Sequence, residues 1–536
     1  MKKLVLIAII LLAAILRFYK LAEVPPSLYW DEASLGYNAY SILKTGHDEH
    51  GVFLPITNFA AFGDYKPPGY VYMTTPSIAL LGLTELAVRF PSALFGMLTV
   101  FLTYLIAKKL FENDKVALFA SFFLAISPWH LQMSRAAFEA NLGLFFSTLA
   151  VFFFIKFSKN PYWLLLSALS FLAAMYTFTG QRLFVPLIAL VLAIQLRRQI
   201  FSNLKIVLAT TVICAILFWP LFRFVTATIE GKLRFNEVTI FKDLKPINDS
   251  VAYRQSDNFA LYSSIIHNRR LFYLHDYLTH YFDAFNPTFL FISGDVNPRL
   301  SIQEIGQLYY FDIFLLPLGV YLLFAKKHKY RFLILGWLLI SPLGPATARE
   351  TPHALRMAHI LPTFQLIGAF AIYRLYRSVK LRKMLAVLTV GIVTLSFFYY
   401  LHMYYIHYAT HYSDQWQYGY KQAVKYVKDN YNNVDNVVVT KSLGRPYIYF
   451  LFYNQYDPTK FWRNSTVTKD EFFFIDVTRY DKFYFSDEPP DKLNLKGKTL
   501  FVTRPNTLPE DIQKTAIIKD PGQNEIFEIS KKDYEK

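Results

Sequence analysis

Long apolar segments recur along the first three quarters of the chain. A helix needs about 20 mostly apolar residues to cross a bilayer. Proline inside several of the segments, for example Pro128, Pro317 and Pro342, is tolerated where helices are bundled. The pattern therefore predicts a polytopic α-helical membrane protein with about eleven transmembrane helices. The predicted spans are 4–21, 86–107, 116–133, 142–157, 162–178, 183–196, 206–225, 309–325, 331–345, 357–376 and 384–405.

Basic residues in the short connections predict the orientation of these spans. One side carries nineteen Lys and Arg, whereas the short loops opposite carry only Arg135, Arg182, Arg349 and Arg356. Because cytoplasmic loops are enriched in Lys and Arg, the first side and the N-terminus are predicted to be cytoplasmic. All three long polar segments then lie outside the cell membrane. They are the first outer loop 22–85, the second long outer loop 226–308 and the C-terminal segment 406–536.

The C-terminal segment has the pattern of a small folded domain. Helical spacing covers 416–430 and 447–456, and Asn436–Thr440 is typical of a buried strand. We therefore predict two domains, a transmembrane domain over 1–405 and an extracytoplasmic α/β domain over 406–536. Further strands are predicted near 471–476, 482–486, 498–503, 515–518 and 525–530.

The first outer loop is predicted to contain amphipathic juxtamembrane helices. Asp31 is expected to be the N-cap of a helix through Leu43, whose apolar spacing indicates that it lies along the membrane surface. A second, partly apolar helix is expected around 71–83. Between them, Pro67 restricts Lys66 to an extended backbone and so limits where its ammonium group points.

Composition narrows the class of protein. The chain has 536 residues, of which 54% are hydrophobic and 18% charged, and this is too apolar for an ordinary soluble protein of that size. Its net charge of +17 does not predict a nucleic-acid partner, because most basic residues lie between the apolar segments. The single cysteine, Cys214, excludes a disulfide within the chain. Motifs of nucleotide-binding proteins and soluble hydrolases do not occur.

Two adjacent carboxylates, Asp31 and Glu32, follow directly after the first span. A carboxylate at this lipid-water boundary can act as general base towards a hydroxyl or amine acceptor. The alternative is that Asp31 only caps a helix and that Glu32 only adds charge to its first turn.

Basic residues on the same outer side could bind a lipid phosphate near these carboxylates. They can neutralise a lipid phosphate at the bilayer interface, and for each one the alternative is snorkelling of a long side chain to the interface. Two of them have acidic neighbours, since Glu85 precedes Arg89 and Glu139 follows Arg135. The basic residues are Arg17, Lys66, Arg89, Arg135 and Arg356.

Two further polar clusters have both a chemical and a structural interpretation. His47-Asp48-Glu49-His50 has a spacing that could hold a divalent metal, but we favour a solvated turn after Gly46 and predict no metal site. Asp48 and Glu49 stay as active-site candidates. The segment Ser293–Arg299 could organise the second long loop through a turn, or it could contact substrate.

Three sequence features together resemble the glycosyltransferase C superfamily. They are Arg17 at the outer end of the first span, Trp30-Asp31-Glu32-Ala33 at the start of a helix, and Tyr65-Lys66-Pro67-Pro68-Gly69-Tyr70. The nearest branch is family 39, the polyprenyl- or dolichyl-phosphate-mannose-protein mannosyltransferases, to which lipid A aminoarabinose transferases are related. The resemblance is sharpest over 17–91, weaker at 134–139 and only architectural in the C-terminal domain. The Trp-Trp-Asp signature of oligosaccharyltransferases is absent, which argues against transfer of a whole oligosaccharide.

The resemblance implies an outward-facing active site and a function for each candidate residue. Asp31 would be the general base or bind the acceptor, supported by Glu32, and Lys66 would contact the lipid phosphate. A single displacement would invert the anomeric configuration. The other implied phosphate ligands are Arg17, Arg135 and Arg356, and the other active-site candidates are Glu139, Asp48, Glu49 and Tyr65.

The implied protein is an integral-membrane glycosyltransferase of the cell membrane, and a prokaryotic plasma membrane is expected. Its donor would be a polyprenyl-phosphate-linked sugar, and its acceptor a protein, lipid or glycan. No cofactor is predicted, and a divalent metal is possible but not favoured. The alternative is a transporter or flippase of lipid-linked sugars. It ranks second because transporters carry repeats and polar, broken helices at mid-membrane, whereas the polar residues here gather at one face.

Overall fold

Apolar helices dominate the computed structural model, which describes residues 1–378, 382–470 and 474–535. Among these residues, four helices are long and apolar enough to cross a membrane. Four shorter apolar helices, of 10–17 residues, accompany them. The chain is thus a multi-pass helical membrane protein, while the number of eleven spans stays a prediction. The four long helices are Glu85–Phe111 (α4), Glu139–Phe157 (α7), Leu204–Ala227 (α11) and Lys383–His411. The last of these consists of Arg382–His402 (α19), Met403–Tyr408 (η5) and Ala409–His411 (α20).

A bend interrupts what would be a fifth span. Helices Asp114–Ile126 (α5) and Pro128–Arg135 (α6) pass the same test together but meet at 56°. Between them, Ser127 has an extended backbone (φ −59°, ψ 124°). Pro128 accounts for this geometry, because proline lacks an N–H and disfavours a helical residue before it.

Contacts between Cα atoms divide the chain into two compact units. Unit one consists of Met1–Arg17, Phe95–Ser134 and Phe138–Tyr400. The predicted domain boundary between residues 405 and 406 stays a prediction. Unit two consists of Phe18–Leu94, Arg135–Ala137 and Leu401–Lys536.

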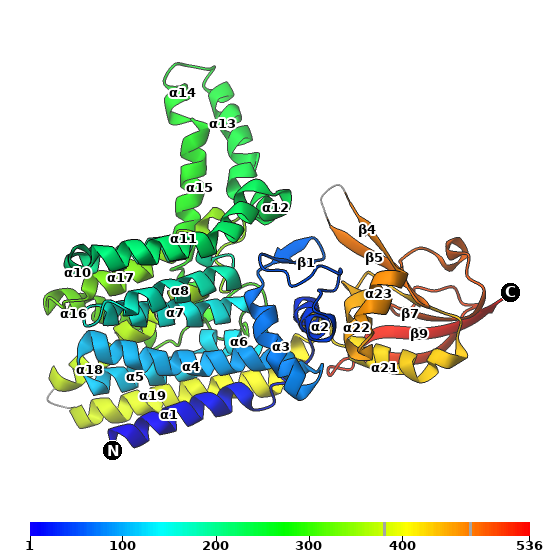
Figure 1. The fold of residues 1–536 in the computed structure, drawn as a ribbon, viewed down its shortest axis with the longest axis horizontal. Helices are drawn as coiled ribbons and strands as arrows, with labels where there is room; N and C mark the ends of the chain where they lie inside the picture. Colours follow the sequence, from blue (N-terminus) through cyan, green and yellow to red (C-terminus); the bar gives the residue numbers. More distant parts are fainter. Residues whose placement is uncertain (379–381, 471–473, 536) are drawn as a thin grey trace. The chain divides into compact units, whose positions relative to one another are not determined.

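Unit one is helical. Helix α7 packs along α8, and α5 and α16 both pack against α18. The predicted second outer loop, 226–308, is largely helical as well, with α13 and α15 side by side (Figure 1). The helices of this unit that have not yet been given are Lys2–Phe18 (α1, whose last residue lies in unit two), Trp163–Thr177 (α8), Gln181–Gln195 (α9), Arg197–Ser202 (α10), Ile229–Val238 (α12), Lys245–Ser256 (α13), Ser263–Ile266 (α14), Arg269–Asp283 (α15), Asp312–Ala325 (α16), Arg331–Ile340 (α17) and Thr363–Ser378 (α18).

Unit two contains a seven-stranded sheet of order β4-β5-β6-β3-β7-β9-β8. The central strand β3 is parallel to β6 and β7, and the other pairs are antiparallel. Val438 and Phe501 pack in a buried cluster on this sheet. The strands are Asn436–Val439 (β3), Ser465–Lys469 (β4), Ile475–Tyr480 (β5), Phe483–Phe485 (β6), Gly497–Thr503 (β7), Gln513–Lys519 (β8) and Glu525–Tyr534 (β9), and the helices beside them are Tyr420–Asn430 (α21), Pro446–Asn454 (α22) and Pro458–Asn464 (α23).

Most strands of this sheet coincide with predicted ones. The exceptions lie at one edge, where β4 was not predicted because its sequence, STVTK, is short of apolar residues and largely exposed. The strand predicted at 471–476 begins on residues 471–473, which lie outside the described residues. Beyond them, β5 begins at Ile475.

The first outer loop lies in unit two and corrects two predictions. Its helix Trp30–Thr45 (α2) begins one residue before Asp31, and Tyr29, not Asp31, is its N-cap. The predicted amphipathic surface helix is also wrong for α2, since the run from Glu32 to Ala39 is buried without interruption. The rest of the loop consists of a hairpin, Phe59–Ala61 (β1) with Asp64–Lys66 (β2), and the helix Gly69–Leu81 (α3).

Candidate active site

Asp31 and Lys66 form an ion pair in unit two. Asp31 lies in the first turn of α2, and Lys66 is the last residue of β2. Lys66 Nζ is 3.3 Å from Asp31 Oδ1, and the side chains are 8% and 32% exposed, respectively. The carboxylate is therefore open to a reactant, while the ammonium group is nearly enclosed.

A second carboxylate, Asp64, shares the same lysine. Lys66 Nζ lies 3.4 Å from Asp64 Oδ2, and Asp64 is also 32% exposed. Asp64 is not among the predicted site residues, although the sequence carries a signal for it. Residues i and i+2 of a strand point to the same face, so Asp64 and Lys66 are neighbours wherever this segment is extended.

Glu32 is not a surface carboxylate but the buried partner of Arg89. Both guanidinium contacts, from Nε and from an Nη, are 2.9 Å long, and the side chains are 2% and 0% exposed. Glu32 also accepts the backbone N–H groups of Tyr29 and Ala137. The sequence placed Arg89 beside Glu85, but Glu85 instead pairs with Lys421. A buried carboxylate needs such partners to be tolerated, and here they fix the start of α2.

Arg135 is also buried, and it holds backbone carbonyls. Its guanidinium donates to the carbonyls of Tyr19 and Val24 at 2.7 and 2.9 Å. It also donates to the hydroxyl of Tyr404 at 3.2 Å, and the ring of Tyr405 lies 5.2 Å from it. Arg135 therefore fastens the segment that leads into α2, and phosphate binding by this residue stays a prediction.

The segment His47–His50 forms the predicted turn, but the turn is not solvated, because the side chains of Asp48 and Glu49 are buried. Asp48 accepts the backbone N–H groups of His50 and Val52, which closes the turn after α2. Glu49 is fully buried, and His50 Nε2 lies 3.5 Å from its carboxylate. Burial raises the pKa of Glu49. Burial alone would lower the pKa of His50, but the Glu49 carboxylate outweighs it and the pKa is raised.

Tyr65 lies between Asp64 and Lys66 in β2, and its side chain therefore points to the opposite face of the strand. The Lys469 ammonium lies 6.0 Å from the centre of that ring. Among the described residues, the buried Tyr65 hydroxyl has no hydrogen-bond partner.

The remaining candidates belong to unit one. Arg17 donates to the carbonyls of Ala13 and Ala125 and lies 2.6 Å from His130 Nδ1. Glu139 is the first residue of α7 and is partly exposed. Arg356 bonds the carbonyl of Glu350 and lies 3.8 Å from its carboxylate.

A turn around Asp295 organises the second long loop of unit one. Asp295 accepts the backbone N–H of Asn297 at 2.8 Å and that of Ala354 at 2.6 Å. Burial raises the pKa of Asp295 to about 6, although both N–H groups oppose the shift.

The site in unit two thus offers a half-exposed acid pair around one enclosed cation. Such a group can accept a proton at Asp31 and can hold an anionic oxygen at Lys66. Nowhere in the described part of the chain do three His, Cys, Asp or Glu side chains gather as metal ligands.

Comparison with known sequences gives a match in the N-terminal half of the chain. Residues 65–223 match the family described as dolichyl-phosphate-mannose-protein mannosyltransferase. This segment includes Lys66 but not Asp31. An uncharacterized protein of Aquifex aeolicus (strain VF5) is 30% identical over 176 residues, which cover 32% of this chain and only 33% of that protein.

Solved structures resemble most of the chain. ArnT from Cupriavidus metallidurans bound to undecaprenyl phosphate has a TM-score of 0.56 at 12% identity, over 98% of this chain and 97% of that one. An Archaeoglobus fulgidus oligosaccharyltransferase has a TM-score of 0.50 at 12% identity, over 84% of this chain and 61% of that one. At these identities the likeness is one of fold.

Proposed function

We propose that the chain is a member of the glycosyltransferase C superfamily, a proposal that the family match over residues 65–223 and the fold of ArnT support, and that it is an inverting glycosyltransferase with a polyprenyl-phosphate sugar as donor. The proposed product is a monosaccharide joined to an acceptor hydroxyl or amine on the outer face of the membrane. The observation that carries the proposal is the pair of Asp31 and Lys66, an exposed carboxylate 3.3 Å from an enclosed ammonium group.

The two charged groups suit the two parts of the reaction, the attack of the acceptor and the departure of the phosphate. Asp31 takes the proton of the acceptor as its oxygen or nitrogen attacks the anomeric carbon. The bond from that carbon to the phosphate oxygen breaks, and polyprenyl phosphate leaves with the electron pair. Lys66 stabilises the charge that develops on the phosphate. A single displacement of this kind inverts the anomeric configuration.

Binding of the donor phosphate also frees the Asp31 carboxylate to accept the proton of the acceptor. In the structure Lys66 is shared between Asp31 and Asp64. A phosphate that takes up hydrogen bonds of the ammonium group competes with both carboxylates, so that Asp31 is released towards the acceptor. Asp64 keeps the ammonium group in place between turnovers.

Glu32, Arg89 and Arg135 position this pair instead of reacting. Glu32 joins the first turn of α2 to Arg89, and Arg135 holds the segment before that turn. Arg17, Arg135 and Arg356 stay as proposed phosphate ligands. Asp48, Glu49, Tyr65 and Glu139 stay as active-site candidates.

A relative of the same fold supports a lipid-phosphate donor. The structure of ArnT with undecaprenyl phosphate has this fold over nearly the whole chain. The description of the matched family also names a lipid-phosphate sugar, dolichyl-phosphate-mannose.

The proposal is tested with the purified full-length protein in proteoliposomes. Radiolabelled sugars are supplied either as polyprenyl-phosphate conjugates or as nucleotide conjugates, together with an envelope extract as acceptor. We expect transfer from a polyprenyl-phosphate sugar only, with release of polyprenyl phosphate. Movement of the intact conjugate across the bilayer without transfer would instead establish a transporter.

A further inference from the structure

The second outer loop of unit one carries a helical arm, which we define as α13, α14 and α15, residues 245–283. In Figure 1, α13 and α15 run crosswise to the apolar helices α11 and α17 of the same unit and project beyond them. A helix that crosses a bilayer runs close to the membrane normal, with a tilt of about 0–40°. An arm that is crosswise to such helices therefore extends along the plane of the membrane.

The base of the arm is fastened at one end of α17. Tyr281 of α15 donates its hydroxyl to the carbonyl of Leu339, in the last turn of α17, at 2.9 Å. Tyr277 donates to the carbonyl of Leu343 at 3.1 Å. The basic connection 326–331 precedes the other end of α17, so the end that holds the arm is the predicted outer one. The arm thus leaves the helices at the level where the predicted span 331–345 meets the membrane surface.

One side of α15 is an exposed apolar stripe. Leu271, Leu274, Leu278 and Phe282 recur at intervals of three or four residues, which places them on one face of the helix. Their exposed fractions are 47%, 51%, 44% and 63%. Contiguous apolar surface of this kind marks a contact with a partner or a membrane.

Other faces of α15 are used to attach it to the protein. The ring of Phe272 lies 5.8 Å from that of Tyr253 in α13, between centroids. The carboxylate of Asp283 accepts the hydroxyl of Thr351 at 2.8 Å. These groups lie on helix faces different from that of the apolar stripe, because their spacing from Leu278 is not that of one helix face. The stripe is therefore directed away from the contacts that hold the arm together.

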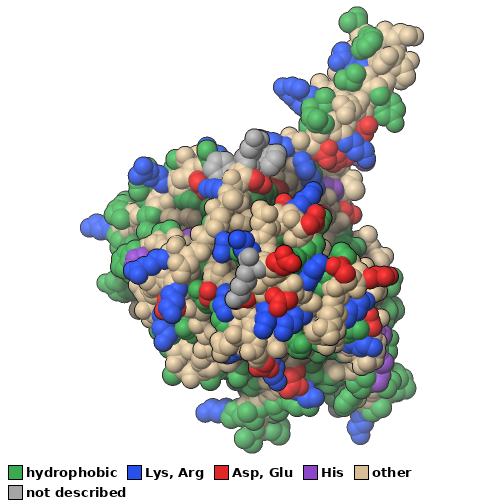
Figure 2. Space-filling view, turned by 90° about the vertical axis from the view of Figure 1, so that its right-hand side faces the viewer, with side chains coloured by type: hydrophobic (Ala, Val, Ile, Leu, Met, Phe, Trp, Pro, Cys, Tyr) green, Lys and Arg blue, Asp and Glu red, His purple; other side chains and the backbone are tan. Residues whose placement is uncertain are grey.

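The tip of the arm is apolar as well and carries basic residues. Leu261, Ile265 and Ile266, in and just before α14, are 91%, 72% and 58% exposed. Arg269 and Arg270 follow at the start of α15 and are also exposed. Figure 2 shows hydrophobic and basic side chains on the projecting arm. An apolar helix face with cations at its end is typical of segments that lie in a membrane interface, where Lys and Arg contact lipid phosphates.

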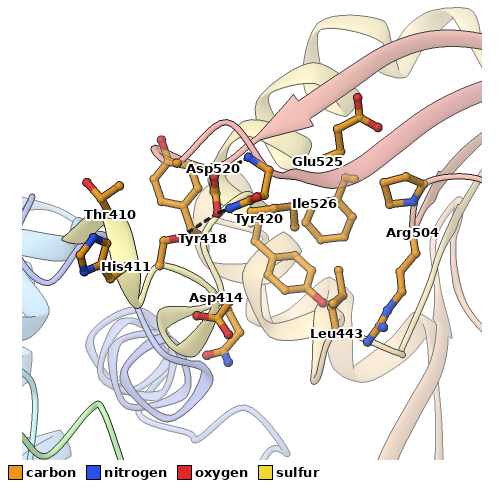
Figure 3. A pocket seen from close by; sticks show the side chains of 16 residues that line it. Thr410, His411, Asp414, Tyr418, Tyr420, Leu443, Arg504, Asp520, Glu525 and Ile526 are labelled. Carbon is orange, nitrogen blue, oxygen red and sulfur yellow. Dashed lines mark hydrogen bonds between the residues drawn. The ribbon is translucent and has the colours of Figure 1, made fainter. Parts of the chain in front are cut away.

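Surfaces of unit two illustrate how differently this protein treats water. Over the broad face seen in Figure 2, basic and acidic side chains are interspersed. A cavity of about 840 Å³ in unit two is bordered by charged groups that include Asp414, Arg504 and Asp520 (Figure 3). Asp520 accepts a hydrogen bond from Asn524, as a dashed line in Figure 3 shows. The stripe of α15 consists of apolar side chains alone, and it suits lipid better than water.

We propose that the arm lies in the lipid interface at the outer end of α17, with the stripe of α15 among the acyl chains and with Arg269 and Arg270 at the lipid phosphates. Lipid is the occupant that explains three features together. The arm extends along the membrane plane, its base is held at the end of a predicted span, and its apolar stripe begins beside two exposed cations. The inference concerns attachment to the bilayer and does not depend on sugar transfer.

The depth of the stripe can be measured by spin labelling. The full-length Cys214→Ser protein is placed in nanodiscs of phosphatidylcholine and phosphatidylglycerol, and a nitroxide is attached to a single cysteine, Leu274→Cys or Leu278→Cys. Collisions are measured with molecular oxygen, which concentrates among acyl chains, and with a nickel chelate, which stays in water. We expect both labels to collide more with oxygen than with the nickel chelate.

Matched control positions lie on the same arm. Asn248 and Gln255 are exposed and seven residues apart, so they share one face of α13. Labels at Asn248→Cys and Gln255→Cys should collide more with the nickel chelate than with oxygen, because this helix lies on the water side of the arm in the proposed arrangement. All four substitutions are at exposed positions and should leave the fold intact.

Charge placed on the stripe should lift it out of the bilayer, because a carboxylate among acyl chains is costly. A label at Leu271→Cys should lose its preference for oxygen when Leu274→Asp and Leu278→Asp are added. Asn248→Asp and Gln255→Asp, which add the same charge to α13, should leave the collisions of that label unchanged. Equal effects of the two pairs would contradict the proposal.

Two results of the depth measurement would overturn the membrane arm. Labels at Leu274 and Leu278 that prefer the nickel chelate, as the labels on α13 should, would place the stripe in water. Labels that collide with neither agent and broaden each other's spectra between molecules would show that a second copy of the chain covers the stripe. All of these spectra are recorded without a sugar donor, so their outcome is separate from that of the transfer assay.

Discussion

At the scale of single residues, one lysine serves two aspartates with equal exposure. Asp31 and Asp64 are both 32% exposed, and their carboxylate oxygens lie at nearly equal distances from Lys66 Nζ, 3.3 and 3.4 Å. Their electrostatic contribution to Lys66 is therefore similar. They differ in their supports, because Asp31 stands on a helix turn that Glu32 and Arg89 fix, whereas Asp64 stands on a short hairpin strand.

Removal of Arg89 alone should destabilise the protein more than removal of the whole ion pair. Arg89→Leu leaves Glu32 as a buried, uncompensated charge, which costs about 3–5 kcal/mol in the free energy of unfolding. The double variant Glu32→Leu/Arg89→Leu should recover part of this loss, because no charge is left buried. Chemical unfolding of the purified variants in detergent checks the order. A double variant that is less stable than Arg89→Leu would contradict this account of the pair.

Residue types could be predicted from the sequence where chemistry marks them, but their partners could not. Asp31 and Lys66 were both singled out, and the structure places them in contact. The pairing of Glu32 with Arg89 joins residues 57 positions apart and depends on how α2 packs against α4, which local patterns do not encode. Arg135 appeared to be a free outer cation for the same reason, although it is buried.

At the scale of elements, helix α2 shows how burial overrides a surface pattern. Its apolar spacing predicted an interfacial helix, but its polar face is buried as well. Gly36 permits this, because a Cβ there would overlap Val88 and Phe452. The strands of the C-terminal sheet were easier to predict, since β3 and β7 are apolar runs in the sequence. The exposed edge strand β4 was not.

Asp295 should make the free energy of unfolding depend on pH. Burial raises its pKa to about 6, from 3.8 in an unfolded chain. The folded protein therefore holds this proton more tightly, so the stabilising contribution is full below about pH 4 and is lost as the pH rises through 6.

Asp295→Asn should remove this dependence. Relative to the variant, the wild type should lose about 2 kcal/mol of unfolding free energy between pH 4 and pH 7. Chemical unfolding in detergent at several pH values measures the difference. A difference between the two proteins that is constant over this range would show that Asp295 does not titrate there.

At the scale of the whole molecule, the proposed outer face follows from the charge of short loops. The long helices and the fold of ArnT agree with a multi-pass membrane protein. The number of spans could not be settled from apolar length, because four of the apolar helices have only 10–17 residues. Such helices are short for a bilayer unless they are tilted or continued by irregular segments.

Thiol labelling of intact cells tests the orientation. In a Cys214→Ser background, the exposed residues Lys498 and Lys329 are replaced by cysteine one at a time. An impermeant maleimide should label Lys498→Cys in intact cells and Lys329→Cys only after permeabilisation. The reverse pattern would place the C-terminal sheet in the cytoplasm and contradict the positive-inside assignment.

The comparison of Asp31→Asn with Asp64→Asn, under saturating donor, tests the central claim most directly. Each change removes one carboxylate charge from Lys66, but only the first removes the proposed base. The account predicts that Asp31→Asn lowers kcat for sugar transfer about 10²- to 10⁴-fold, as loss of a general base does, while Asp64→Asn stays within a few-fold of wild type. Equal losses in the two variants, or full activity of Asp31→Asn, would contradict it.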